Sequence, residues 1–207
     1  MYQNIIWDFD GTLFDTYPSM TKTFLRVLKD NGINESYENI LRLMKISASH
    51  AFRYCTENYQ ISEDRLYHFY TIDKKTNPED FLPFPDCKDI CKRIYESGKK
   101  NYLFTHRGKD AIAHIKHYGL DQYFEEYVIG GSGFKRKPDP EGILYLMDKY
   151  NMKPEDTLMI GDRDIDIIAA KNASIKACYF WQHPNAVVKE ADHIIASIQE
   201  LEAIIGL

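Results

Sequence analysis

Residues 5–15 read IIWDFDGTLFD, in which an apolar run leads directly into two carboxylates, Asp8 and Asp10, followed by a Gly-Thr break. The apolar run predicts a β-strand over residues 2–8. Residues i and i+2 of a strand share a face, so both carboxylates begin on one side as the chain leaves the sheet. Two adjacent carboxylates favour a bound cation or a shared proton, and hard oxygen ligands suit Mg²⁺. The alternative is an ordinary surface turn, because Asp and Gly are common turn residues.

Length and composition indicate a globular protein of one large domain, or one domain with an insert. The chain has 207 residues, of which 44% are hydrophobic and 28% charged, and its net charge of −5 offers no basic field for nucleic acid or an anionic membrane. It contains no apolar run of about 18 residues and no secretory signal pattern, so a cytoplasmic location is the default expectation. Four scattered cysteines favour buried thiols over disulfides or a metal site.

The spacing of apolar residues changes once along the chain. Helical spacing predicts helices over 18–31, 37–44 and 48–59, and a fourth that begins near Ser62 and carries Leu66, Phe69, Tyr70 and Ile72. Two prolines in residues 81–86 then break the pattern. Strands and helices alternate afterwards. We expect strands at 101–105, 127–129, 157–160, 176–180 and 193–196, and helices at 87–97, 109–118, 140–150, 165–172 and 198–205.

This alternation predicts an α/β fold with a doubly wound, mainly parallel, Rossmann-like sheet. We expect an α/β core domain from residues 1–15 and 83–207, and an inserted all-helical domain over residues 16–82. Ligands of such sheets bind outside the carboxyl ends of the strands. Each further polar cluster of this sequence follows a predicted strand.

The second cluster is Thr105-His106-Arg107, at the end of a predicted strand. A hydroxyl and backbone N–H groups at a helix N-terminus can hold a phosphate, although Thr105 could simply cap the helix. Arg107 could reach a substrate, or form a surface ion pair with Asp164 or Asp139.

The third cluster, FKRKPDP at residues 134–140, is either a solvated basic loop or a loop whose prolines hold one lysine rigid beside a phosphoryl group. The Pro-Asp-Pro that follows Lys137 selects it over Lys135 and Arg136. In the fourth cluster, Gly161-Asp162 follows a strand, and Asp166 lies four residues on, so Asp162 and Asp166 can share a helix face.

Together the four clusters resemble the haloacid dehalogenase-like hydrolase superfamily, in the branch with a helical cap inserted after the first strand, similar to phosphoglycolate phosphatases and β-phosphoglucomutases. The resemblance covers nearly the whole chain. It is carried by residues 8–12, Thr105, Lys137, Gly161, Asp162 and Asp166.

The resemblance implies a role for each residue. Asp8 would be the nucleophile that forms an aspartyl-phosphate, and Asp10 the general acid and then the base that activates water. Thr105 would donate a hydrogen bond to a phosphoryl oxygen, and Lys137 would offset negative charge. The ligands of Mg²⁺ would be Asp8, the backbone carbonyl of Asp10, Asp162 and Asp166, the last as a ligand or an anchor.

Further substrate-binding candidates lie beside the site and in the predicted cap. His106 and Arg107 stand where the family commonly has smaller residues. In the cap, Lys45 and Arg53, with Ser47 and His50, form a polar patch near a predicted helix–helix turn. This patch could contact the leaving group, or it is a solvated helix face.

The resemblance thus implies a Mg²⁺-dependent phosphatase acting on a small phosphorylated metabolite, in a monomer or weak dimer. A phosphomutase of the β-phosphoglucomutase type would use the same two aspartates, and release of free phosphate distinguishes the two. A dehalogenase is disfavoured by Asp10 and the acidic fourth cluster. A non-catalytic binding protein with this fold would lack the nucleophile or a metal ligand, whereas all are present.

Overall fold

The computed structural model describes residues 1–67, 79, 81–180 and 190–207. The chain divides into two units: an α/β unit formed by Met1–Phe14 and Pro83–Leu207, and a helical unit formed by Asp15–Leu82. The chain therefore passes between the units twice, at neighbouring points. The backbone N–H of Asp15 donates to the carbonyl of Leu82 at 3.0 Å, so the first and last residues of the helical unit are hydrogen-bonded to each other.

The α/β unit is built on a six-stranded sheet of order β3-β2-β1-β4-β5-β6, in which every pairing is parallel. Its strands are β1 (Asn4–Trp7), β2 (Lys100–Phe104), β3 (Phe124–Val128), β4 (Thr157–Gly161), β5 (Lys176–Phe180) and β6 (His193–Ile195). All four residues of β1 are buried, as expected for a central strand with both faces covered. The strand order reverses direction at β1 and β4, and the crevice at such a point is the usual ligand site of open parallel sheets.

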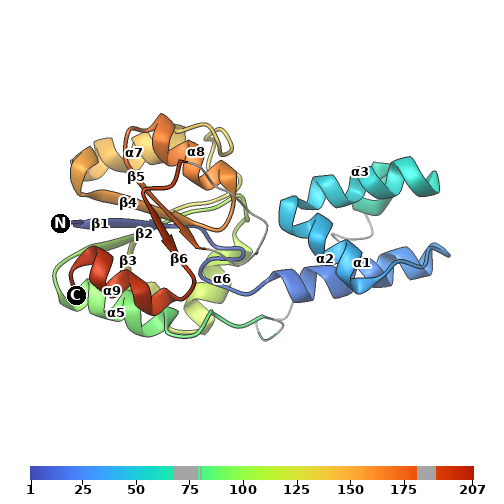
Figure 1. The fold of residues 1–207 in the computed structure, drawn as a ribbon, viewed down its shortest axis with the longest axis horizontal. Coiled ribbons are helices and arrows are strands. Elements are labelled where there is room, and N and C mark those ends of the chain that lie inside the picture. Colours follow the sequence, from blue (N-terminus) through green and yellow to red (C-terminus); the bar gives the residue numbers. More distant parts are fainter. Residues whose placement is uncertain (68–78, 80, 181–189) are drawn as a thin grey trace. The chain divides into compact units, whose positions relative to one another are not determined.

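Helices cover both faces of this sheet (Figure 1): α7 and α8 lie on one face, and α5, α6 and α9 on the other. Their bounds are α5 (Cys87–Glu96), α6 (Asp110–His117), α7 (Glu141–Tyr150), α8 (Asp164–Asn172) and α9 (Leu201–Ile205). The small side chains of Ala169 and Ala170 let α8 pack closely on β4 and β5. The predicted doubly wound α/β fold is therefore confirmed.

The helical unit has its own apolar core. Its helices are α1 (Tyr17–Asp30), α2 (Tyr37–Ile46) and α3 (Ala48–Tyr59), followed by helical residues 63–67. Ser36 and Ser47 cap α2 and α3, because each hydroxyl accepts the N–H of the residue three positions on. Of the predicted fourth helix, Leu66 is buried in this core, whereas Phe69, Tyr70 and Ile72 lie outside the described residues.

Most predicted bounds agree with the described elements to within about two residues, and two elements differ more. Strand β3 begins at Phe124, three residues before the predicted start, because Glu125 and Glu126 interrupt the apolar pattern of an edge strand that is only partly buried. The predicted final helix over 198–205 is a 3₁₀ turn, Ile198–Glu200, followed by α9. Both differences lie away from the polar strand ends.

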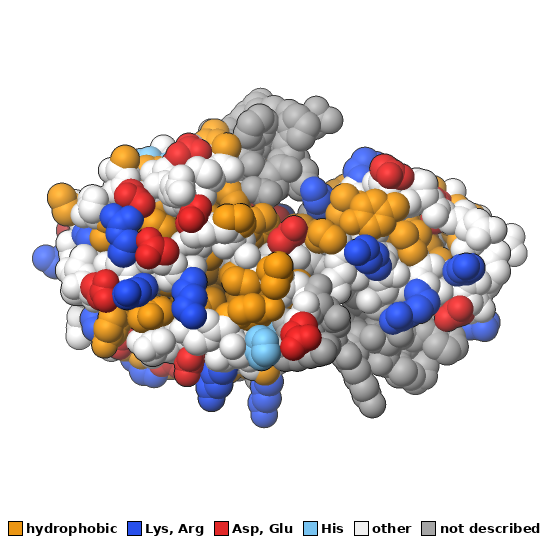
Figure 2. Space-filling model, turned by 90° about the horizontal axis from the view of Figure 1, so that it is seen from below, with side chains coloured by type: hydrophobic (Ala, Val, Ile, Leu, Met, Phe, Trp, Pro, Cys, Tyr) orange, Lys and Arg blue, Asp and Glu red, His pale blue; other side chains and the backbone are white. Residues whose placement is uncertain are grey.

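The surface carries charges of both signs. Lys and Arg side chains are interspersed with Asp and Glu on the face that Figure 2 shows. On α5, for example, Arg93 forms ion pairs with Asp89 and Glu202. Within the described residues, the longest helices are too short and too polar to span a bilayer.

Candidate active site

Three buried carboxylates meet at the carboxyl edge of β1 and β4. The N–H of Asp8 donates to the carbonyl of Ile160 at 2.9 Å, which fixes the end of β1 beside the end of β4. One carboxylate oxygen each of Asp8, Asp162 and Asp166 lies within 4.8 Å of the other two, and the three residues are at most 3% exposed. The parallel pairing of the two strands therefore brings together residues more than 150 positions apart in the sequence.

Lys137 lies among these carboxylates. Its Nζ is 2.6 Å from Asp8 Oδ1 and 2.5 Å from Asp166 Oδ1, and it donates to the carbonyl of Phe104 at 3.0 Å. Burial lowers the pKa of Lys137, but the facing Asp166 and Asp8 raise it further, so the net direction is upward and the side chain stays protonated. We call Lys137, Asp8, Asp162 and Asp166 the lysine cluster.

The neighbouring basic residues of the same loop lie elsewhere. Lys135 is exposed and its Nζ is 3.5 Å from Asp139, and Arg136 is exposed as well. Of the three consecutive basic side chains, Lys137 is thus the one that the fold buries against Asp8.

Asp166 is held in place by the start of α8. Its Oδ2 accepts the backbone N–H of Arg163 at 3.1 Å, which caps the helix. A Cβ on Gly161 would lie 2.3 Å from the Asp166 Cβ, so only glycine permits this approach. The four-residue spacing of Asp162 and Asp166 brings them together because the helix begins between them.

The lysine cluster fits a small divalent cation. It contains three carboxylates and one lysine, and the nearby Arg163 offsets only part of the excess negative charge. Burial raises the pKa of Asp8 to about 6; Lys137 opposes this shift and Asp166 adds to it. Asp8 Oδ2 is buried without a hydrogen-bond partner in the described part of the chain. A buried anionic oxygen in this state is what a metal ligand requires.

Asp10 lies in a second group of charges. Arg107 donates from Nη2 to Asp10 Oδ1 at 2.5 Å, and from Nε to Oδ1 at 3.0 Å and Oδ2 at 3.2 Å. Its Nη1 donates to Asp110 Oδ2 at 2.8 Å. We call Arg107, Asp10 and Asp110 the arginine cluster. The sequence suggested Asp164 or Asp139 as partners of Arg107, whereas these contacts join it to Asp10 and Asp110. The arginine side chain is 1% exposed, so this is a buried ion pair and not one at the surface.

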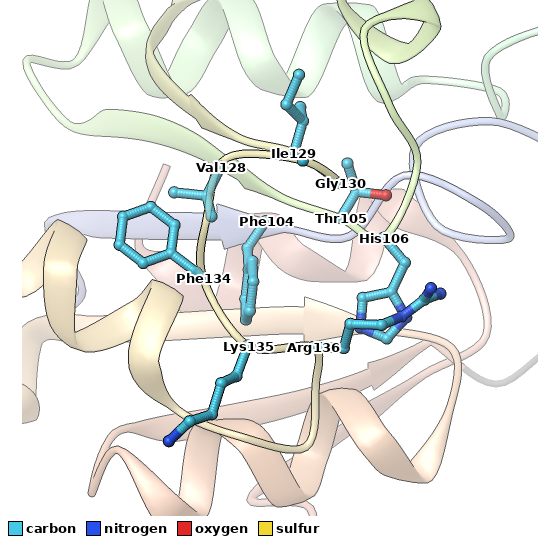
Figure 3. A pocket seen from close by; sticks show the side chains of 10 residues that line it. Phe104, Thr105, His106, Val128, Ile129, Gly130, Phe134, Lys135 and Arg136 are labelled. Atoms are coloured by element: carbon cyan, nitrogen blue, oxygen red, sulfur yellow. The ribbon is translucent and has the colours of Figure 1, made fainter.

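The loop after β2 contributes residues both to the arginine cluster and to the lining of a small cavity. The buried Thr105 accepts the N–H of Arg107 on its Oγ1 at 3.1 Å. A cavity of about 90 Å³ is lined by Thr105 and His106 but by neither Asp8 nor Lys137. Figure 3 shows His106 and Arg136 pointing to the same side of this cavity and Lys135 pointing the other way. Burial and the positive charges of Lys137 and Arg136 lower the pKa of His106 to about 3, so its ring is neutral.

The predicted cap residues belong to the helical unit. Lys45 lies in the last turn of α2, Ser47 is the N-cap of α3, and His50 and Arg53 are exposed on α3. Ser47 thus has a structural task at the helix–helix turn, where its Oγ accepts the N–H of His50 at 3.0 Å. Substrate contact by Lys45 and Arg53 stays a prediction.

Besides the pairing of Arg107 with Asp10, the contacts of Asp110 and Thr12 were not predicted from the sequence. Asp110 follows Arg107 by three residues, a spacing that often pairs opposite charges at a helix start and that could have indicated this ion pair. The contact of Thr12 Oγ1 with Asp162 Oδ1 at 3.5 Å links residues 150 positions apart, and local spacing carries no signal for it.

The sequence of this chain is similar to those of known proteins. Residues 5–180 match the haloacid dehalogenase-like hydrolase family. A phosphoglycolate phosphatase of Vibrio vulnificus is 26% identical over 227 residues, which cover 95% of this chain and 93% of that protein. A pyrophosphatase PpaX of Listeria monocytogenes is 27% identical over 208 residues, covering 97% and 95%.

A solved structure shares the fold of this chain. A haloacid dehalogenase-like protein of Streptococcus pneumoniae superposes with a TM-score of 0.84 and 19% identity, over 98% of each chain. With 176 of 207 residues matched in order, the chain belongs to the haloacid dehalogenase-like hydrolase family.

Proposed function

We propose that this protein is a phosphatase that hydrolyses a small phosphorylated metabolite through an aspartyl-phosphate on Asp8. The observation that carries the proposal is the contact of Lys137 with both Asp8 and Asp166, beside Asp162, at the carboxyl edge of the sheet. The names of the relatives, phosphoglycolate phosphatase and pyrophosphatase, support phosphate chemistry.

The proposed reaction has two displacements. An Asp8 carboxylate oxygen attacks phosphorus, and the bond from phosphorus to the leaving oxygen breaks while Asp10 donates a proton to that oxygen. Water then attacks the phosphorus of the aspartyl-phosphate, Asp10 takes a proton from the water, and the bond to Asp8 breaks. The products are an alcohol and inorganic phosphate, and both aspartates return to their starting states.

The remaining residues align the phosphoryl group and compensate its charge. Lys137 holds Asp8 in one orientation and offsets negative charge, because its ammonium contacts Oδ1 directly. Thr105 would hydrogen-bond a phosphoryl oxygen, and His106, held neutral, would donate or accept a hydrogen bond at the edge of the site. Phosphoryl transfer requires mainly this kind of positioning and electrostatic stabilisation.

A bound Mg²⁺ would be held by Asp8, Asp162, Asp166 and the backbone carbonyl of Asp10. When bound, it would compensate the charge of the phosphoryl oxygens and of the three carboxylates. Its fit rests on the excess of buried negative charge described above. We keep as predictions the action of residues 16–82 as a cap, the cytoplasmic location and the monomeric or weakly dimeric state.

The test is a screen of phosphorylated metabolites with added Mg²⁺ that detects free phosphate. The panel contains sugar phosphates, nucleotides, phosphoglycolate and pyrophosphate, the last two chosen from the names of the relatives. We expect D8N to lose at least about 10⁴-fold in turnover, since removal of a nucleophile leaves only the other groups of the site. D148N makes the same change at an exposed position of α7 and should retain the activity.

The outcomes separate the alternatives. Full activity in D8N contradicts Asp8 as the nucleophile. Conversion of a sugar phosphate to its isomer without free phosphate indicates a phosphomutase. Absence of turnover on the whole panel, with Mg²⁺ binding retained, indicates a binding protein.

A further inference from the structure

We propose that Arg107 is a positioning residue that holds the carboxylate of Asp10 toward the leaving group and does not itself bind substrate. This inference rests on the proposed function, because it assigns a task to a side chain beside the same site. It replaces the expectation that Arg107 contacts the substrate.

The guanidinium of Arg107 holds Asp10 through its planar edge. Three donor contacts reach the Asp10 carboxylate, at 2.5, 3.0 and 3.2 Å, two of them on Oδ1. Hydrogen bonds between two charged groups are about twice as strong as neutral ones, and the arginine fork fixes direction as well as distance. The rotation of the Asp10 carboxylate is therefore restricted.

Arg107 is itself held from several sides. Its Nη1 donates to Asp110 at 2.8 Å, and its backbone N–H donates to Thr105 Oγ1 at 3.1 Å. Its guanidinium carbon lies 5.2 Å from the centre of the Phe9 ring, within cation–π distance. Phe9 lies between Asp8 and Asp10, so the contact ties Arg107 to the turn that carries both aspartates. A side chain anchored in this way can transmit its orientation to Asp10.

Exposure distinguishes positioning from substrate binding. The Arg107 side chain is 1% exposed, whereas the Asp10 side chain is 20% exposed. Asp10 is thus the member of the pair that an incoming leaving group can reach. For Arg107 to bind a phosphate directly, its guanidinium would have to give up contacts to Asp10 and Asp110 and leave its buried position.

The test uses R107K, which keeps the positive charge and removes the fork. Two substrates are compared: 4-nitrophenyl phosphate, whose leaving group departs as an anion, and the alkyl phosphate that the wild type hydrolyses fastest. The first displacement is measured alone, as the single-turnover rate of leaving-group release with enzyme in excess, because the second displacement uses Asp10 as a base with either substrate. In the first displacement, only the alkoxide leaving group requires a well-placed proton donor. We expect this rate to fall about 100-fold for the alkyl phosphate and by less than roughly fivefold for 4-nitrophenyl phosphate, since general acid catalysis contributes 10²- to 10⁴-fold. The half-saturating enzyme concentration should change little for either substrate.

R93K provides the matched control and should behave like the wild type, because Arg93 is a partly exposed residue of α5 that pairs with Glu202 away from the proposed site. Two results would overturn the proposal. An equal fall of the single-turnover rate for both substrates would indicate a merely structural role. A raised half-saturating enzyme concentration for both, with the single-turnover rate retained, would indicate that Arg107 binds the phosphoryl group.

A second measurement does not require turnover. A double-mutant cycle of R107M and D10N in denaturant unfolding measures the interaction energy between the two side chains directly. We expect a coupling of at least about tenfold in the unfolding equilibrium constant, and additive effects would contradict the holding of Asp10. If the wild type hydrolyses no phosphate ester, the proposed function fails, while this cycle still decides whether Arg107 holds Asp10.

Discussion

Two groups of charges lie at the same edge of the sheet, and they differ in how their charges are balanced. The lysine cluster sets three buried carboxylates against one ammonium, which acts as a point charge. The arginine cluster sets two carboxylates against one guanidinium, which contacts both. The lysine cluster has an excess of buried negative charge, which would suit a further cation. The arginine cluster is more nearly balanced, and its fork fixes orientation.

Asp8 and Asp10, one in each cluster, also differ in their exposure and in the contacts of their carboxylate oxygens. Asp8 is 1% exposed and has one carboxylate oxygen without a protein partner in the described residues. Asp10 is partly exposed and has both oxygens in contact with one arginine. A nucleophile requires a free oxygen directed at phosphorus, and a proton donor requires a fixed position beside the leaving group. Each surrounding suits the role proposed for its aspartate.

Replacing Lys137 should have the largest effect on stability. Without Mg²⁺, we expect K137M to lower the free energy of unfolding by about 3–5 kcal/mol, because the buried carboxylates of Asp8 and Asp166 then lose their ammonium partner. Turnover should fall about 10²- to 10³-fold, the usual loss when one preorganised charged donor is removed. Denaturant unfolding and steady-state kinetics measure the two effects.

K135M gives the control, since it makes the same change two residues earlier, at an exposed side chain. If K137M unfolds like K135M, the lysine cluster does not depend on its ammonium, and the contrast between the two clusters is lost.

Magnesium should have the next largest effect on stability, and the size of this effect should depend on Asp162. At a concentration 100 times its Kd, Mg²⁺ should stabilise the wild type by about 2.7 kcal/mol. In D162N one negative charge is gone, so the metal-free protein should be as stable as the wild type or more stable. Its gain from Mg²⁺ should be smaller, with affinity at least about tenfold weaker.

Thermal unfolding with and without Mg²⁺, and with EDTA, measures these changes, and D148N is the control with the same change of charge. An identical Mg²⁺ response in wild type and D162N would contradict the proposed metal ligands. It would also show that the buried carboxylates are balanced without a divalent ion.

The sequence predicted most of the lysine cluster, because parallel strands meet at one edge. Asp8 and Asp162 each follow an apolar strand, and Lys137 precedes a Pro-Asp-Pro that restrains its loop. Strand order is a global property, but the rule that ligands gather at the carboxyl ends needs only strand positions. The periodicity of the chain supplied these positions to within one to three residues.

The arginine cluster was not predicted, for a physical reason. The pairing of Arg107 with Asp10 depends on the path of the turn after β1, where the N–H of Phe14 donates to the carbonyl of Phe9 at 3.0 Å. Periodicity does not describe such a turn, and charged residues in loops usually remain solvated. Burial of Arg107 could therefore be known only from the folded chain.

A third charged group, near edge strand β6, shows how much an accessible ion pair should contribute to stability in comparison with the two buried clusters. Asp192 contacts Lys171 and Lys176 and accepts the N–H of Ala177 at 2.9 Å. Asp192 is partly buried, which raises its pKa, but the hydrogen bonds from Lys171, Lys176 and Ala177 outweigh this, so its pKa lies well below the ordinary value. Because both lysines are partly exposed, we expect D192N to cost only about 1 kcal/mol at pH 7.

The pH dependence of D192N follows from the sign of that shift. A carboxyl whose pKa is lower in the folded state stabilises the protein above its unfolded value of about 3.9, and this stabilisation is lost as pH falls toward the folded value. The difference between wild type and D192N in denaturant unfolding should therefore be constant from pH 6 to 7 and shrink below about pH 4. It should also shrink in about 1 M salt, which screens accessible charges. A loss as large as that of K137M would show that accessible and buried ion clusters contribute alike, and burial would then not explain the lysine cluster.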